Sequence, residues 1–218
     1  MIAVKLVLIA VLSYLLGSVN FGIILSRKIE KDDVRHHGSG NAGSTNMLRS
    51  YGKKMAALTI IGDMLKVAVA IIIARFIIGA EDYNGYVIFI KSFAGLFCVL
   101  GHIFPCYFNF NGGKGVATCG GMVFMIDWRI GLILLAVFII TVAITKWVSL
   151  GSIIMAVLYP ILMFAFYRSL WITVISAVFA VIVIVAHRTN IKKLINGTES
   201  KISFSKKSED KRDRKSVV

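Results

Sequence analysis

Residues 55–78 read MAALTIIGDMLKVAVAIIIARFII, and this long apolar run decides the fold. About 20 predominantly apolar residues are enough for a helix to cross the hydrocarbon core of a bilayer. Further apolar runs lie on both sides of this one. We therefore predict an integral membrane protein of the all-α class, a polytopic helical bundle with seven transmembrane helices. The predicted segments are Ile2–Leu25, Met55–Ile78, Tyr86–Phe104, Lys114–Ile126, Ile130–Thr145, Ser149–Tyr167 and Leu170–Ala186.

Composition indicates a single membrane domain. The chain has 218 residues, of which 57% are hydrophobic, and its mean hydropathy is +0.80, whereas soluble domains are usually nearer half apolar. We expect residues 1–199 to form the domain. Residues 200–218 form a basic tail, which we expect to be disordered because it is charged and lacks an apolar core. Only three residues separate the segments at 114–126 and 130–145, so five spans are the alternative if this pair re-enters the membrane or lies shallow.

Positive charge gathers in two parts of the chain. The formal net charge is +14, and Lys and Arg cluster within residues 27–54 and from residue 188 onward. Because cytoplasmic loops carry an excess of such residues, we expect the N-terminus outside and the C-terminus in the cytoplasm. This topology puts three polar segments on the cytoplasmic side: the first polar segment (residues 38–46), the second (residues 101–118) and the third (residues 187–190). No series of base-stacking aromatic residues accompanies the tail, so we expect no nucleic acid partner.

The second polar segment carries a glycine-rich sequence suited to an anion. Gly112, Gly113 and Gly115 surround Lys114, and an apolar helix is predicted to follow. Glycines let a backbone approach a ligand closely, and a helix N-terminus offers unpaired N–H groups with partial positive charge. Thr118 is expected one turn later on the same face. Because Gly115 stands where a Walker A loop needs Ser or Thr, nucleoside triphosphate binding is not indicated.

The first polar segment is also rich in small hydrogen-bonding groups. Five small polar side chains occur within eight residues, which exceeds the needs of one helix cap, although a plain capping loop is the alternative. Arg49 follows, and its planar guanidinium suits bidentate phosphate binding. The candidate ligands in this segment are Ser39, Gly40, Asn41, Gly43, Thr45 and Asn46.

Ionisable residues within or beside the predicted spans complete the candidates. Asp63 and Lys66 share a helix face, and charges inside a membrane are functional by default. We expect them to support the site, with Asp63 orienting Lys66 toward it; a structural ion pair is the alternative. His102 and His187 each end a span on the cytoplasmic side, where either could donate a hydrogen bond, act as a general base or simply pack at the interface. Ser149 is either a helix cap or a pocket residue.

These segments resemble the three signature motifs of the bacterial acyl-phosphate:glycerol-3-phosphate acyltransferases. Gly-Ser-Gly-Asn-x-Gly-x-Thr-Asn, followed by Arg, corresponds to Gly38–Asn46 with Arg49. Gly-His-x-Phe-Pro…Phe-x-Gly-Gly-Lys-Gly-Val-Ala-Thr corresponds to Gly101–Thr118, and His-Arg-x-Asn-Ile…Gly-x-Glu corresponds to His187–Glu199. The resemblance covers residues 1–199, and only the basic tail looks additional.

The resemblance implies a seven-helix enzyme that transfers an acyl group from acyl phosphate to the 1-hydroxyl of sn-glycerol 3-phosphate. The products would be lysophosphatidic acid and phosphate, in the first acylation step of phospholipid biosynthesis. It implies that neither coenzyme A nor a metal nor another cofactor is needed. We expect a monomer in the bacterial plasma membrane, with its active site on the cytoplasmic side and with its two substrates and the lipid bilayer as partners.

The candidate residues suit that chemistry, because two phosphate-bearing substrates need cations between them. We expect Lys114 and its glycine-rich loop to hold one phosphate, and Arg49 and the first polar segment to hold the other. Asn190 and His187 are expected to orient the nucleophilic hydroxyl. No His is followed by Asp five positions later, which excludes the mechanism of the acyltransferases that carry His-x4-Asp. The proton acceptor stays open among His187, His102, Asn190 acting through water, and a substrate phosphate.

Two other classes of membrane protein are weaker interpretations. A transporter or channel for a phosphorylated solute would be expected to show broken helices near the midplane and repeat symmetry. Here the polar segments are predicted at one face, and the sequence contains no evident repeat. A CDP-alcohol phosphotransferase would carry a paired-aspartate metal motif, which the sequence lacks.

Overall fold

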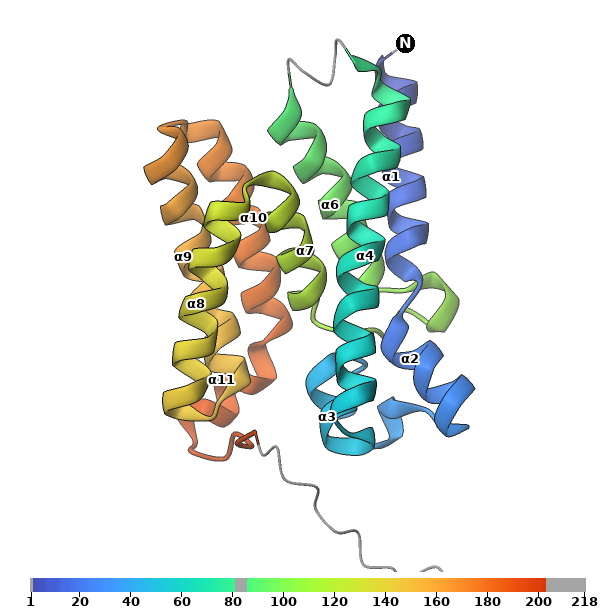
Figure 1. Cartoon of the computed structure of the whole chain (residues 1–218), viewed down its shortest axis with the longest axis vertical. Coiled ribbons are helices and arrows are strands. Elements are labelled where there is room, and N and C mark those ends of the chain that lie inside the picture. Colours follow the sequence, from blue (N-terminus) through green and yellow to red (C-terminus); the bar gives the residue numbers. More distant parts are fainter. Residues whose placement is uncertain (1, 81–85, 203–218) are drawn as a thin grey trace, which may run out of the picture.

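The computed structural model describes residues 2–80 and 86–202, and every regular element in these ranges is helical (Figure 1). Helices are the expected solution for apolar runs in lipid, because they satisfy their backbone hydrogen bonds internally. The elements are α1 (Ile2–Ser18), α2 (Phe21–Leu25), η1 (Ser26–Glu30), η2 (Val34–His36), α3 (Ser44–Tyr51), α4 (Lys53–Ile78), α6 (Val87–Ile103), η3 (Cys106–Phe108), α7 (Val116–Ile126), α8 (Trp128–Thr145), α9 (Val148–Tyr167), α10 (Leu170–Ala186) and α11 (Arg188–Ile195).

The predicted all-α membrane bundle is confirmed, whereas the number of spans is not settled by helix length. Within the described residues, five stretches are long and apolar enough to cross a membrane, and α10 with α11 makes a sixth if that pair, bent by 62°, is one span. Helix α7 has 11 residues, so it is about 16 Å long and covers roughly half of the hydrocarbon core. Seven transmembrane helices and the orientation of the termini therefore stay predictions. Residues 81–85 of the predicted outer loop and residues 203–218 of the predicted tail lie outside the described residues.

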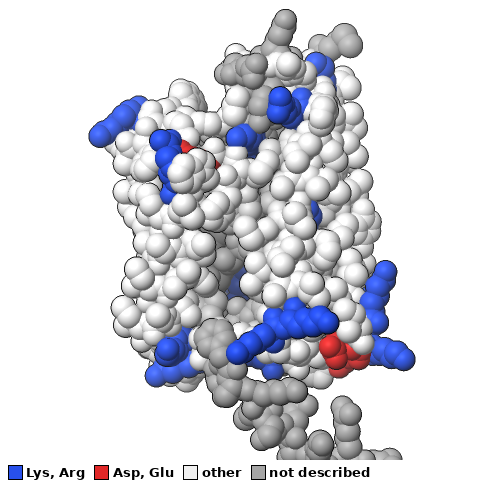
Figure 2. Space-filling view, in the orientation of Figure 1, with Lys and Arg blue, Asp and Glu red and all other residues white. Residues whose placement is uncertain are grey.

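The outer surface of the bundle is apolar, as contact with lipid requires. Large hydrophobic side chains are exposed along the helices, such as Phe76 on α4, Ile144 on α8 and Trp171 on α10. Lys and Arg side chains gather toward the two ends of the bundle and leave most of the middle of the visible face uncharged (Figure 2).

Two glycines let α1 and α6 pack backbone against backbone. A Cβ on Gly17 would lie 2.1 Å from the carbonyl oxygen of Cys98, and a Cβ on Gly101 would lie 2.2 Å from that of Tyr14. Small residues are favoured at such crossings because helices in lipid associate mainly through close packing. This crossing fixes the start of the second polar segment against α1.

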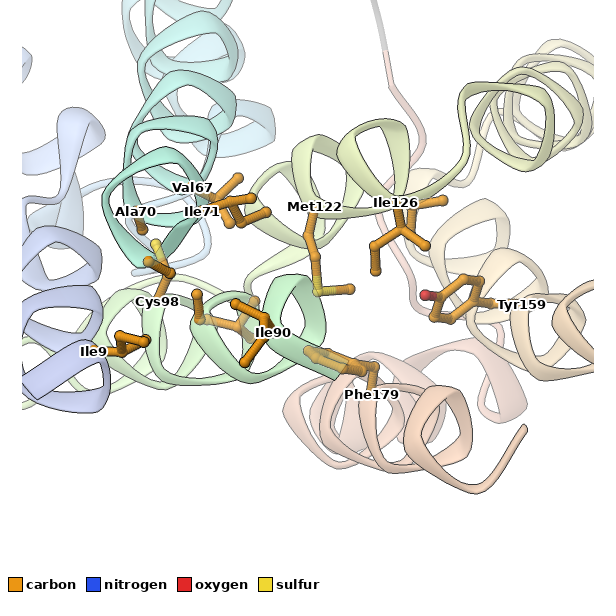
Figure 3. Close-up of a cluster of buried hydrophobic side chains, with 14 of the residues drawn as sticks. Ile9, Val67, Ala70, Ile71, Ile90, Cys98, Met122, Ile126, Tyr159 and Phe179 are labelled. Carbon is orange, nitrogen blue, oxygen red and sulfur yellow. The ribbon is translucent and has the colours of Figure 1, made fainter. Parts of the chain in front are cut away.

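Helix α7 lies between two groups of helices: α1, α4 and α6 on one side, and α8, α9 and α10 on the other (Figure 1). Buried side chains from both groups meet around Met122 of α7, among them Val67 of α4 and Phe179 of α10 (Figure 3). Beyond this core, toward the end of the bundle opposite the N-terminus, lie α3, the start of α7 and α11 (Figure 1). These are the elements that carry the polar segments.

Candidate active site

A cavity of about 930 Å³ lies between the two groups of helices, where Figure 2 shows the surface hollowed. Its polar end is lined by residues of all three polar segments, and the remainder is lined by apolar side chains such as Phe124 of α7 and Phe138 of α8. Ile60 of α4 and Ile139 of α8 line the cavity and are also exposed on the outer surface. The cavity therefore combines an anion-receptive end with an apolar groove that opens on the side of the bundle.

A hydrogen-bond network crosses the polar end of the cavity. Lys114 Nζ donates to Asn190 Oδ1. Asn190 Nδ2 and Ser149 Oγ each donate to Glu199 Oε1 at 2.7 Å. Trp147 Nε1 donates to the backbone carbonyl of Glu199 at 3.2 Å, which fixes the position of that residue. The second and third polar segments therefore meet in space, as the sequence predicts.

Lys114 is a partly desolvated cation at the start of α7. Burial lowers the pKa of Lys114 to about 8, the carboxylate of Glu199 opposes this change, and the nearby positive charges of Lys193 and Arg49 add to it. No side-chain hydrogen bond caps the first turn of α7, which begins two residues after Lys114, so this turn has N–H groups without a side-chain partner. At neutral pH, most Lys114 side chains still carry a charge that an anion can neutralise.

The ring of His187 is oriented by the backbone of α10. Its Nδ1 lies 2.7 Å from the carbonyl oxygen of Val183, and a carbonyl can only accept, so Nδ1 carries the proton. Nε2 is then the ring nitrogen that carries the lone pair. His187 is buried and lines the cavity, so it presents the form of imidazole that a general base requires.

Asn46 braces the first polar segment from the inside. Its Nδ2 donates to the carbonyls of Val34 and His37, both at 2.9 Å, and its Oδ1 accepts from the N–H of Ser39 at 3.0 Å. Both N–H groups of the amide, and its oxygen, have partners within the protein. Asn46 therefore shapes the loop, although it was predicted as a substrate ligand.

Helix α3 directs its N-terminus and a guanidinium toward the cavity. Its N-cap residue, Gly43, has no side chain to bond the first turn, so the N–H groups of Ser44 and Thr45 have no side-chain cap. Both residues line the cavity, as does Arg49. Arg49 Nη2 also donates to the carbonyl of Ser200 at 3.0 Å. The first polar segment thus reaches the same end of the cavity as the other two.

Gly112 and Gly113 are needed for close packing on α6. A Cβ on Gly112 would lie 2.1 Å from the carbonyl oxygen of His102, and a Cβ on Gly113 would lie 2.0 Å from its Nε2. Their N–H groups donate to the carbonyls of Ile103 and His102 at 3.2 and 3.1 Å. The structure therefore uses these two N–H groups to seat the loop, whereas they were predicted to bind phosphate.

Asp63, Lys66 and His102 form a buried cluster behind the second polar segment. Lys66 Nζ lies 2.9 Å from Asp63 Oδ1 and 2.8 Å from His102 Nδ1. It also donates to the carbonyls of Gly17 and Val19, both at 3.0 Å, where α1 ends. Lys66 therefore points toward α1 rather than toward the cavity, which differs from the expectation that Asp63 orients it toward the site.

The structure brings most of the predicted residues to the cavity and leaves some away from it. Thr118 was expected to face the site one turn after Lys114, but it is fully buried, and its Oγ1 has no hydrogen-bond partner among the described residues. The predicted residues that do not line the cavity are Gly40, Lys66, Gly112, Gly113 and Thr118. Those that line it are Ser39, Asn41, Gly43, Thr45, Asn46, Arg49, Asp63, His102, Lys114, Gly115, Ser149, His187 and Asn190.

Glu199 is the residue that the candidate list lacked. It contributes a carboxylate to the centre of the polar end, where two side chains from other elements bond it. The available signal was the third motif, His187–Glu199, which ends in this glutamate. Its partners could not be found from the sequence, because Ser149 lies 50 positions away.

Known proteins with similar sequences share one description. A family model described as glycerol-3-phosphate acyltransferase matches residues 7–197. A glycerol-3-phosphate acyltransferase of Thermoanaerobacter pseudethanolicus is 41% identical over 196 residues, which cover 90% of this chain and 95% of that relative. A protein of the same name from Clostridioides difficile is 42% identical over 201 residues, which cover 92% of this chain and 97% of that relative.

Two solved structures have a similar fold. They are crystal structures of PlsY (YgiH), described as an integral membrane glycerol 3-phosphate acyltransferase, in its glycerol 3-phosphate form and its lysophosphatidic acid form. The first has a TM-score of 0.81 and 32% sequence identity, and the second has 0.79 and 31%. Each comparison covers 91% of this chain and 96% of the other.

Proposed function

This chain belongs to the glycerol-3-phosphate acyltransferase family and is an integral membrane acyltransferase, and we propose that its acyl donor is an acyl phosphate. The acceptor is the 1-hydroxyl of sn-glycerol 3-phosphate, and the products are lysophosphatidic acid and inorganic phosphate. The family role places this reaction in phospholipid biosynthesis. Neither coenzyme A nor a metal takes part in the proposed reaction.

The observation that carries the proposal is that one cavity has a polar, positively charged end and an apolar remainder. Its polar end holds Lys114, just before the start of α7, and Arg49, in the last turn of α3, and an apolar groove continues from it. Both proposed substrates bear a phosphate, and one of them also bears a long hydrocarbon chain. Cations and helix N-termini suit the phosphates, and the groove suits the chain.

The proposed reaction is a single displacement at the acyl carbon. The hydroxyl oxygen of glycerol 3-phosphate attacks the acyl carbonyl carbon, and the bond from that carbon to the phosphate oxygen breaks. The phosphate leaves with the electron pair, and the hydroxyl proton goes to Nε2 of His187 or to a phosphate oxygen. Because the acyl group is already activated, positioning and stabilisation of the developing negative charge can supply most of the catalysis.

Each polar segment has a distinct part in this proposal. Lys114 and the N-terminus of α7 hold one phosphate, and Arg49 with the N-terminus of α3 holds the other. Asn190 orients the hydroxyl, and Glu199 keeps Asn190 in place through their hydrogen bond. We place the protein in the bacterial plasma membrane as a monomer, with this end of the bundle on the cytoplasmic side.

Replacing Lys114 with Ala tests the phosphate role. We expect kcat/KM to fall by about a hundredfold or more, because a positioned cation is lost from a desolvated site. The assay uses purified protein in detergent with palmitoyl phosphate, glycerol 3-phosphate and a metal chelator, and it measures lysophosphatidic acid and phosphate. Lys54→Ala, which removes an exposed cation outside the cavity, is the matched control.

The same assay tests the donor. With palmitoyl coenzyme A in place of palmitoyl phosphate, we expect no product. Equal rates with both donors would show that the choice of acyl phosphate is wrong, whereas near wild-type activity of Lys114→Ala would remove the ammonium group from the mechanism.

A further inference from the structure

Arg35 lies outside the cavity and connects two of the polar segments. Its side chain is 14% exposed, and all three guanidinium nitrogens donate. Nε and Nη2 donate to the two carboxylate oxygens of Asp33 at 3.0 and 2.8 Å. Nη1 donates to the carbonyls of Phe108 and Asn111 at 3.0 and 2.9 Å. One side chain therefore joins Asp33, which precedes the first polar segment, to the loop that leads into Gly112.

The carboxylate of Asp33 is a fixed anchor for this guanidinium. Besides Arg35, it accepts from Arg27 Nε and Nη2 at 3.0 and 2.8 Å. Hydrogen bonds from Arg35 hold the pKa of Asp33 well below its usual range. The next residue, Val34, is buried and its carbonyl accepts from Asn46, so the anchor is tied to the first polar segment.

The two carbonyls that Arg35 holds enclose a strained turn. Asn109 and Phe110 both have left-handed backbone angles, with φ of 56° and 55°. Asn tolerates this conformation, but a bulky residue such as Phe adopts it only where the surrounding structure compensates. The carbonyls of Phe108 and Asn111 stand immediately before and after this pair, so one guanidinium nitrogen holds both of its ends.

The strained turn determines the position of Lys114. Asn111 is followed by the two glycines that seat the loop on α6, and then by Lys114. If the turn relaxed, the residues after it would shift along α6, and the ammonium group would leave its place opposite Asn190. A displacement of about 1 Å is enough to cost a large part of an enzyme's activity.

We propose that Arg35 is a positioning residue, which clamps both ends of the Asn109–Phe110 turn and so holds Lys114 in its phosphate-binding place. This inference rests on the proposed phosphate role of Lys114. Arg35 itself touches no substrate. Lysine cannot replace it, because an ammonium group lacks the planar, forked donors that reach a carboxylate and two carbonyls at once.

The first test compares Arg35→Ala and Arg35→Lys with wild type and with Lys28→Ala, which removes an exposed cation from the same basic region. We expect both Arg35 variants to raise KM about tenfold for whichever substrate shows a raised KM in Lys114→Ala, with a much smaller change in kcat. Lys28→Ala should behave as wild type. In the double variant with Lys114→Ala, the Arg35 substitution should add little, because the two act on one interaction.

A rescue experiment separates positioning from general support of the fold. Glycine adopts left-handed angles without strain, and Phe110 is exposed, so Phe110→Gly keeps the turn without needing a clamp. We expect Phe110→Gly to restore the KM of Arg35→Ala to within about threefold of wild type, as expected when the strain is removed at its source.

Hydrogen exchange gives a readout that does not depend on activity. In Arg35→Ala, the amides of residues 111–115 should exchange faster, while those of α4 stay protected. Unchanged exchange in the loop, an unchanged KM, or no rescue by Phe110→Gly would overturn the clamp. If wild type makes no product from palmitoyl phosphate, the proposed donor fails, and the exchange result still decides the clamp.

Discussion

The protonation of Lys114 depends on a balance between its charge and its burial. Its pKa is lowered to about 8 because the ammonium group is partly desolvated. The protonated form, on which the proposed phosphate binding depends, is therefore complete well below pH 8 and is lost as the pH rises through 8. In water, the same group would stay protonated to about pH 10.

This balance predicts a pH dependence of binding. In wild type, KM for the substrate held by Lys114 should rise progressively above pH 8, while kcat changes less. Lys114→Arg carries a charge that does not titrate in this range, so its KM should stay flat between pH 7 and 9 even if it is higher overall. An inflection near pH 8 that persists in Lys114→Arg would assign the titration to another group.

For single residues, the sequence predicted which residue types come together at the cavity, but not all of their contacts. Lys114, Asn190 and His187 line one cavity, as expected from segments that were predicted to lie on the same side of the membrane. Thr118 does not, since its direction depends on how α7 is rotated against its neighbours. Lys66 was assigned to the site, but carbonyls at the end of α1 bind it, and no local pattern reveals them.

Among the elements, α7 forms one wall of the apolar groove. Gly120 lines the cavity, and a Cβ there would meet no atom within 4 Å. Its position, five residues beyond Gly115, is about 7.5 Å along the helix. A side chain at this point would occupy space that a long acyl chain needs, without touching the polar end.

Gly120→Leu should therefore shift the enzyme toward shorter acyl chains. We expect the ratio of kcat/KM for decanoyl phosphate to that for palmitoyl phosphate to rise roughly tenfold. Folding should not suffer, since Leu favours a helix more than Gly does. Gly120→Ala, which adds one methyl group, should give a smaller shift in the same direction. An equal loss with both donors would place the acyl chain elsewhere.

Helix positions were largely predictable, and the exceptions have tertiary causes. The segment expected at Leu170–Ala186 is the observed α10, because the apolar run defines its length and Ser169 caps its start. The first predicted segment, Ile2–Leu25, is instead broken between α1 and α2. Lys66 bonds the carbonyls of Gly17 and Val19 at this break, and a partner 49 residues away cannot be inferred from local sequence.

For the whole molecule, the distribution of charge predicts its orientation in the membrane. In a background with Cys98, Cys106 and Cys119 replaced by Ser, single cysteines introduced by Lys31→Cys, Lys193→Cys and Arg168→Cys report on both ends of the bundle. On intact cells, an impermeant maleimide should label only Arg168→Cys, because basic loops are retained inside. All three should react after the membrane is permeabilised. Labelling of Lys31→Cys on intact cells would put the active site on the outer face.

Ile60 and Ile139 line the cavity and are also exposed on the outer surface of the bundle. This side opening offers the product a route out of the cavity. A lysophospholipid that left through water would expose its tail at about 0.8 kcal/mol per methylene, or roughly 12 kcal/mol for sixteen carbons. A sideways route into the adjoining leaflet avoids that barrier. Turnover should then follow the fluidity of the neighbouring lipid, and a stiff bilayer should slow an enzyme whose chemistry is unchanged.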